Sequence, residues 1–118
     1  MLDDNSKLES LAEISILRFL SANKVPTRVV CQGSYSLKTK RQVMKSLAIF
    51  DSKYYIYFQG KYVNNPSGSG KLSVFSSIVL IDWSTGDPVE LEHTHVDTSD
   101  DIDLFKNQLI PYIREEES

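Results

Sequence analysis

The first part of the chain has apolar residues at helical spacing. Between Ser6 and Ala22 one broad face would carry Leu8, Leu11, Ala12, Ile16, Phe19 and Leu20. Pro26 disfavours the α conformation at Val25, so the helix is expected to end just before it. Ile14 and Leu17 fall outside the apolar face. This helix therefore has more apolar surface than packing against a single sheet requires.

Five strand-like segments follow the helix. They are expected at residues 28–37, 42–50, 54–63, 72–83 and 89–97. Gly33 interrupts the first segment and suggests a bulge or bend. The fourth is apolar on both faces, and strict alternation places Phe75, Val79 and Trp83 on one of them. That pattern is typical of a strand covered on both sides.

The end of the chain predicts a second helix from about Asp100. Thr98 can cap it, and Pro111 is expected to kink or interrupt it. Residues 113–118 are acidic and are expected to form a frayed tail. The fold class predicted for the single domain, residues 1–118, is α+β: a five-stranded antiparallel β-meander flanked by an N-terminal and a C-terminal helix. The alternative is a curved, OB-like barrel, which is disfavoured because the link between the third and fourth strands is too short for a helix.

Composition narrows the class of protein further. With 118 residues, 41% of them hydrophobic and 25% charged, the chain fits one ordinary globular core. The acidic, polar N-terminus is unlike a signal peptide, and the longest apolar run is too short to cross a bilayer. The single cysteine, Cys31, excludes an internal disulfide. We therefore expect an intracellular protein, cytoplasmic or nuclear and not secreted, with no cofactor and no membrane partner.

Charge is distributed unevenly along the sequence, and this asymmetry leads to the preferred function. Residues 24–71 contain nine basic residues and one acidic residue, a net charge of +8, whereas residues 72–118 contain two basic and eleven acidic residues, a net charge of −9. Two segments of opposite charge can attract each other within one chain or between two chains. We expect a non-catalytic protein–protein interaction subunit or adaptor of an intracellular complex, with a homodimer as one form. The apolar candidates for the interface are Ile14, Leu17, Phe75, Val79 and Trp83.

The basic middle of the chain supports an alternative, a single-stranded nucleic-acid-binding domain. Lys and Arg side chains neutralise phosphates, and exposed Tyr rings stack on bases. The candidate residues are Lys38, Lys40, Arg41, Lys61, Tyr35, Tyr55 and Tyr57. The net charge of −3 for the whole chain weakens long-range attraction to nucleic acid.

A second alternative is a small enzyme or metal-binding protein using the two histidines in a pocket. In "VELEHTHVD", strand alternation would place His93, His95 and Asp97 on one face, as two imidazoles and a carboxylate for one ion. The sequence has no GxSxG or HExxH motif, and "PSGSGK" lacks the spacing of a phosphate loop. We therefore interpret the segment as the end of a strand and expect no enzyme.

Overall fold

A computed structural model of the chain describes residues 2–32, 35–36, 41–68 and 70–117. Its elements in chain order are α1 (Leu2–Ala22), β1 (Thr27–Gln32), β2 (Tyr35–Ser36), β3 (Arg41–Ile49), β4 (Tyr54–Asn64), β5 (Lys71–Asp82), β6 (Asp87–Pro88) and α2 (Ser99–Glu117). All pairs are antiparallel, in the order β1-β3-β4-β5-β6, and β2 also pairs with β3. The α+β meander is confirmed. The sheet is open and not a barrel.

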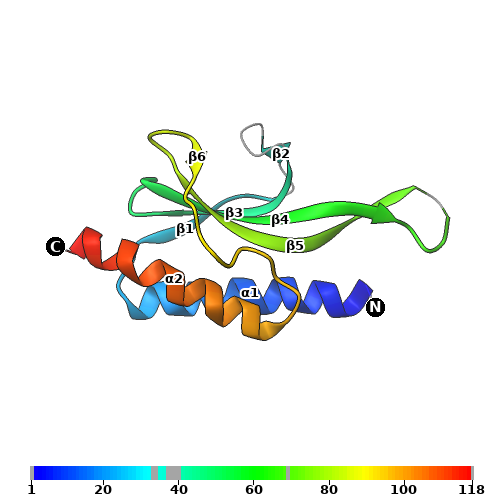
Figure 1. Ribbon diagram of the computed structural model, residues 1–118, viewed down its shortest axis with the longest axis horizontal. Helices are drawn as coiled ribbons and strands as arrows, with labels where there is room; N and C mark the ends of the chain where they lie inside the picture. The colour runs from blue at the N-terminus through cyan, green and yellow to red at the C-terminus, as the bar shows by residue number, and fades with distance from the viewer. Residues whose placement is uncertain (1, 33–34, 37–40, 69, 118) are drawn as a thin grey trace.

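Both helices lie against the same face of the sheet, which we call the helix face (Figure 1). The helices contribute apolar side chains at helical spacing, and β3, β4 and β5 supply the side chains that oppose them. The most completely buried members of this core are Ala12, Ile16, Leu20, Leu47, Ile56, Phe58, Ile78, Leu80 and Phe105. No helix of the described residues lies on the opposite side of the sheet, which we call the open face. The β4–β5 hairpin extends beyond the helices, so Tyr62 is exposed there.

An extra residue in β5 shifts the alternation that the sequence predicts. Gln59 pairs with Ser77 and Gly60 pairs with Phe75, so Ser76 has no opposite residue in β4. The β5 residues that precede this bulge therefore point to the opposite face from the one that strict alternation predicts. Phe75 therefore lies on the helix face, with its ring centroid 6.0 Å from that of Phe58. The predicted grouping of Phe75 with Val79 on one face is wrong, because periodicity assumed an unbroken strand.

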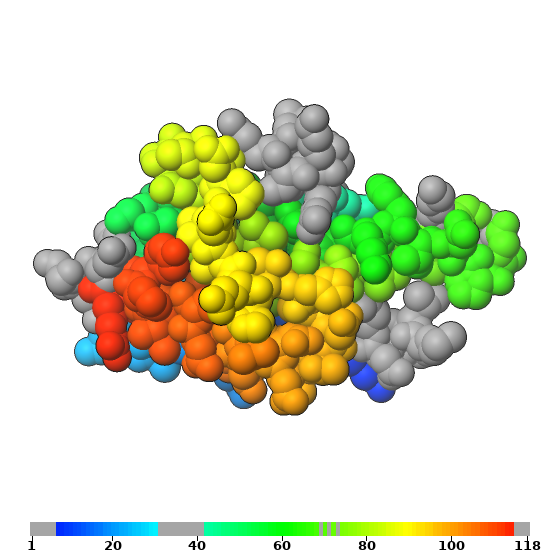
Figure 2. Space-filling view, in the orientation of Figure 1, coloured from blue at the N-terminus to red at the C-terminus, as the bar shows by residue number. Residues whose placement is uncertain are grey.

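A regular fifth strand at residues 89–97 is also a wrong prediction. Only Asp87–Pro88 form β6, and a single bridge joins Ser77 to His95. We call residues 87–98 the edge segment; Figure 2 shows it in yellow, running from the β5–β6 turn to α2. The amide of Val89 donates to the Leu80 carbonyl, and the amide of Ile78 donates to the Thr94 carbonyl. Residues 89–94 therefore span only two steps of β5 and must loop away from it.

Helix α2 continues through Pro111 to Glu117, so Pro111 does not interrupt it. The predicted frayed tail is not observed from its proposed start, because Ile113 is helical and belongs to the buried core. Its apolar side chain stabilises the last turns by packing against the sheet. Among the described residues, neither helix has the length and apolarity needed to span a membrane.

Candidate functional site

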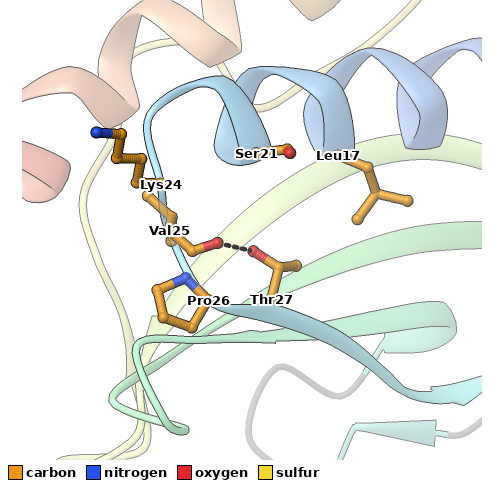
Figure 3. A pocket seen from close by; sticks show the side chains of 6 residues that line it. All are labelled: Leu17, Ser21, Lys24, Val25, Pro26 and Thr27. Carbon is orange, nitrogen blue, oxygen red and sulfur yellow. Dashed lines mark hydrogen bonds between the residues drawn. The ribbon is translucent and has the colours of Figure 1, made fainter.

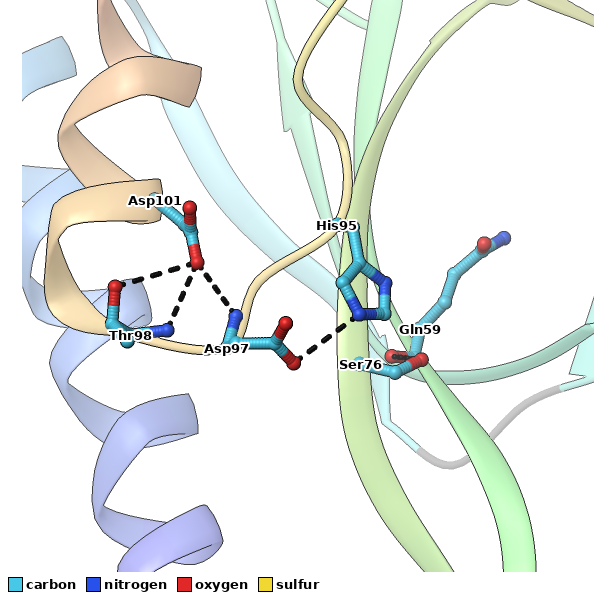
Figure 4. A network of polar contacts seen from close by, with 6 residues as sticks. All are labelled: Gln59, Ser76, His95, Asp97, Thr98 and Asp101. Atoms are coloured by element: carbon cyan, nitrogen blue, oxygen red, sulfur yellow. Dashed lines mark hydrogen bonds and ion pairs between the residues drawn. The ribbon is translucent and has the colours of Figure 1, made fainter.

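The two histidines occupy different environments, although they are one residue apart. His95 Nε2 lies 3.2 Å from Asp97 Oδ1, and both side chains are mostly exposed (Figure 4). His93 is held through its backbone: its amide donates to Gln108 Oε1 (2.9 Å), and its carbonyl accepts from Gln108 Nε2 (2.6 Å). In the described parts of the chain, no three His, Cys, Asp or Glu side chains gather closely enough to hold a metal ion. The predicted trio is therefore not assembled as a ligand set.

Asp97 lies beside the N-terminal cap of α2. Asp101 Oδ2 accepts hydrogen bonds from the amides of Asp97 (2.8 Å) and Thr98 (3.0 Å), and the amide of Asp101 donates to the Thr98 carbonyl (3.1 Å). These donors favour the charged carboxylate and lower the pKa of Asp101 below its ordinary value. The arrangement resembles a capping box. The acidic residues near Asp97 therefore serve to cap the N-terminus of α2.

The open face carries an aromatic group that joins residues distant in sequence. Tyr55 and Tyr57 are neighbours on β4, with ring centroids 6.2 Å apart, and the Trp83 ring lies 4.5 Å from Tyr55. Trp83 is 53% exposed, whereas the tyrosines are half-buried against each other. The sequence interpretation paired the two tyrosines but did not place Trp83 with them. Only the β4–β5 register brings it there, since Asp82, the residue before it, pairs with Tyr54.

The basic residues of the nucleic-acid prediction are only partly described. Lys61 is exposed and shares the open face with Tyr57, four residues along β4, which is about 13 Å at the usual strand rise. Lys38 and Lys40, together with the side chains of Tyr35 and Arg41, lie outside the described part of the chain. The structure therefore brings together Tyr55 and Tyr57 but leaves the predicted basic cluster undescribed.

Strand β1 forms one edge of the sheet and carries apolar side chains that remain exposed. Val29 is 48% exposed and Val30 is 43% exposed. The register shifts between Val29 and Cys31, so Val30 is an extra residue in a bulge, while Val29 pairs with Leu47 and shares its helix face. Edge strands usually carry charges or prolines that prevent further pairing. An apolar edge is therefore a feature of functional interest that the sequence reading missed, because periodicity does not reveal which strand ends a sheet.

A groove adjoins this edge where α1 passes into β1. It encloses about 500 Å³ and is lined by Leu17, Ser21, Lys24, Val25, Pro26 and Thr27 (Figure 3). We call it the β1 groove. Thr27 Oγ1 donates to the Val25 carbonyl (3.0 Å) and stabilises the turn. Ile14, one turn before Leu17 on α1, is 48% exposed.

Of the predicted interface residues, Ile14, Leu17 and Trp83 are thus accessible, whereas Phe75 and Val79 are buried.

A buried charge pair joins α1 to β3. Lys45 Nζ forms an ion pair with Glu13, and the Lys45 side chain is 10% exposed. Lys45 alternates with Leu47 in β3 and therefore points to the helix face, opposite Phe58. Burial raises the pKa of the nearby Glu9 above its ordinary value, and the charge of Glu13 adds to this while Lys45 opposes it. The pair fixes α1 on the sheet, and the sequence reading had counted Lys45 only as part of a basic segment.

Comparison with known proteins does not assign the chain to a group. No family model matches the sequence, and no curated protein or solved structure matches it either.

Proposed function

We propose that this chain is a non-catalytic protein-interaction domain, a subunit or adaptor that binds a partner along β1. The observation that carries the proposal is the exposed apolar edge, with Val29 and Val30 beside the β1 groove. Exposed apolar surface of this kind is typical of an interaction site. The uneven charge of the chain supports association as well.

Pairing at β1 would follow the strand-addition mode of recognition. One side of β1 bonds to β3, and along the described residues no strand pairs with its other side. An extended segment of a partner would satisfy these backbone groups and place alternate side chains over Val29 and into the β1 groove. Lys24 and Arg28 are exposed beside this edge, which favours a partner segment carrying acidic residues.

A charge placed on the edge tests this function. Val29→Lys with Val30→Lys should abolish binding, because a partner strand would have to bury two ammonium groups. Val29→Thr with Val30→Thr keeps the branched shape and is the matched control. Partners captured on the parent chain and on both variants would be quantified side by side, and self-association would be followed by light scattering.

The decisive result is an association that the lysine variant loses and the threonine variant keeps, with new hydrogen-exchange protection in β1 on binding. If the parent chain stays monomeric and captures the same proteins as the lysine variant, the proposal fails. Circular dichroism of each variant shows whether the fold is intact.

Single-stranded nucleic acid binding is a second candidate, supported by the aromatic group on the open face. A base stacked on an aromatic ring contributes about 1–3 kcal/mol. Trp83→Ala should therefore weaken binding of a labelled oligonucleotide at least about fivefold, and affinity should fall steeply with salt. An oligonucleotide that does not bind the parent chain at low salt removes this candidate.

A further inference from the structure

A second cavity lies where the edge segment loops away from β5, far from β1 in the strand order of the sheet. It is open to solvent on one side and has a volume of about 310 Å³, at the lower end of small-molecule sites. Its lining residues are Gln59, Val79, Pro88, Val89, Glu90, Leu91 and Thr94. We call it the edge cavity.

The cavity is a consequence of the chain path. The edge segment bonds to β5 at Val89 and Thr94, and within the described chain residues 90–93 make no backbone hydrogen bond to β5. The backbone of His93 is tied to Gln108 of α2, so the loop is drawn away from the strand and held there. The cavity is therefore preformed, which lowers the entropic cost of binding.

The lining combines an apolar surface with a few polar groups. Val79, Val89 and Leu91 form the apolar part, Thr94 adds a hydroxyl, and the fully buried Gln59 lies behind them. Ser77, which pairs with Gln59 across the strands, has a buried Oγ with no hydrogen-bond partner among the described residues. This composition fits a small organic molecule with an apolar body and one hydrogen-bonding group.

The charged residues near the cavity indicate which charge the polar group of the ligand carries. Among the described residues that line the cavity, Glu90 alone is charged. Residues 72–105, which supply six of the seven described lining residues, contain eight acidic residues and no Lys or Arg. Lys61 follows Gln59 on the open face of β4, and no ion pair between it and Glu90 occurs in the part of the chain that the structure describes. A cationic ligand is therefore favoured over an anionic one.

We propose that the edge cavity binds a small organic amine, with its apolar body against Val79 and Leu91 and its ammonium group paired with Glu90. Glu90 is exposed, so the ion pair contributes specificity while the apolar contacts hold the ligand. This site does not depend on the β1 edge, and either proposal can fail alone.

The test is a titration of isotope-labelled protein, observed by NMR, with three probes of similar shape. They are 2-phenylethylamine, 2-phenylethanol and 3-phenylpropionate, which carry a cation, a neutral hydroxyl and an anion. The amine should cause saturable shifts at Val79, Leu91 and Thr94, and the other two probes should bind more weakly. Glu90→Gln should lower the affinity for the amine about fivefold. Glu92→Gln, an exposed carboxylate of the same loop that does not line the cavity, is the matched control and should leave it unchanged.

Four results would overturn the proposal. The first is the absence of a saturable shift with the amine, and the second is a set of shifts that map away from the edge cavity. The third is an anionic probe that binds as tightly as the amine. Equal losses in Glu90→Gln and Glu92→Gln would show a diffuse acidic surface in place of a site, and this too contradicts the assignment.

Discussion

Gln108 of α2 is expected to hold the edge segment in place, and Gln108→Met tests this directly. The methionine side chain preserves length and helix propensity but removes both hydrogen bonds to the backbone of His93, at 2.9 and 2.6 Å. Hydrogen bonds of this kind contribute about 0.5–1.5 kcal/mol each. Both are at the surface, so the pair should contribute about 1.5 kcal/mol to the local stability of the segment.

This loss should appear as local opening more than as global unfolding. The edge segment keeps its bonds at Val89, Thr94 and Val96, and the core cluster does not depend on Gln108. A change of about 1.4 kcal/mol is tenfold in an equilibrium constant, so the His93 amide should exchange with deuterium about tenfold faster. Amide exchange measured by NMR gives this quantity for each residue.

Two companion variants make the result interpretable. Gln108→Glu keeps an oxygen acceptor for the His93 amide but removes the donor, so its exchange rate should fall between those of the parent and Gln108→Met. Asn107→Met places the same side chain at the exposed neighbouring position and should leave His93 unchanged. An unaltered His93 exchange rate in Gln108→Met would refute the role of Gln108.

Three further predictions concern stability, measured by urea unfolding. Phe58→Ala should cost about 3–5 kcal/mol, because its ring is fully buried, and a loss below about 1 kcal/mol would contradict this packing. Lys45→Met should cost about 3 kcal/mol by leaving Glu13 without its cation, and Lys45→Met with Glu13→Leu should recover most of the loss; no recovery would refute the pairing. The raised pKa of Glu9 means that its stability contribution is full below the ordinary value of 4.5 and is lost as pH rises through the folded value. Glu9→Gln should therefore gain stability relative to the parent as pH rises from acidic to neutral, and a constant difference would contradict the shift.

Local patterns were sufficient for the regular elements. The helical spacing of Ala12, Ile16 and Leu20 predicted the buried face of α1, and their burial confirms it, whereas Leu11 of the same predicted face is 47% exposed. Periodicity predicts such a face because it is a property of a few consecutive residues. The meander also followed from the sequence, since short links favour antiparallel neighbours.

Pattern reasoning failed where one residue interrupts a regular strand. Ser76 shifts the phase of β5 and moves Phe75 to the helix face, and no local signal distinguishes Ser76 from its neighbour Ser77. The fifth strand is replaced by a loop because Gln108, fifteen residues later, bonds to the backbone of His93. Both the bulge in β5 and the loop in the edge segment depend on contacts with residues distant in sequence.

The sequence by itself determined the two terminal helices, the strands between them as far as β5, the α+β class and the uneven charge, because these depend on spacing and composition alone. Tertiary structure decided which strand lies at the edge, and so left Val29 and Val30 exposed. It also decided that Trp83 joins Tyr55, and that a cavity opens beside Glu90. Both proposed surfaces are formed by segments brought together only when the sheet is paired and the helices are packed, and the physical reason is that exposure and cavities depend on those nonlocal contacts.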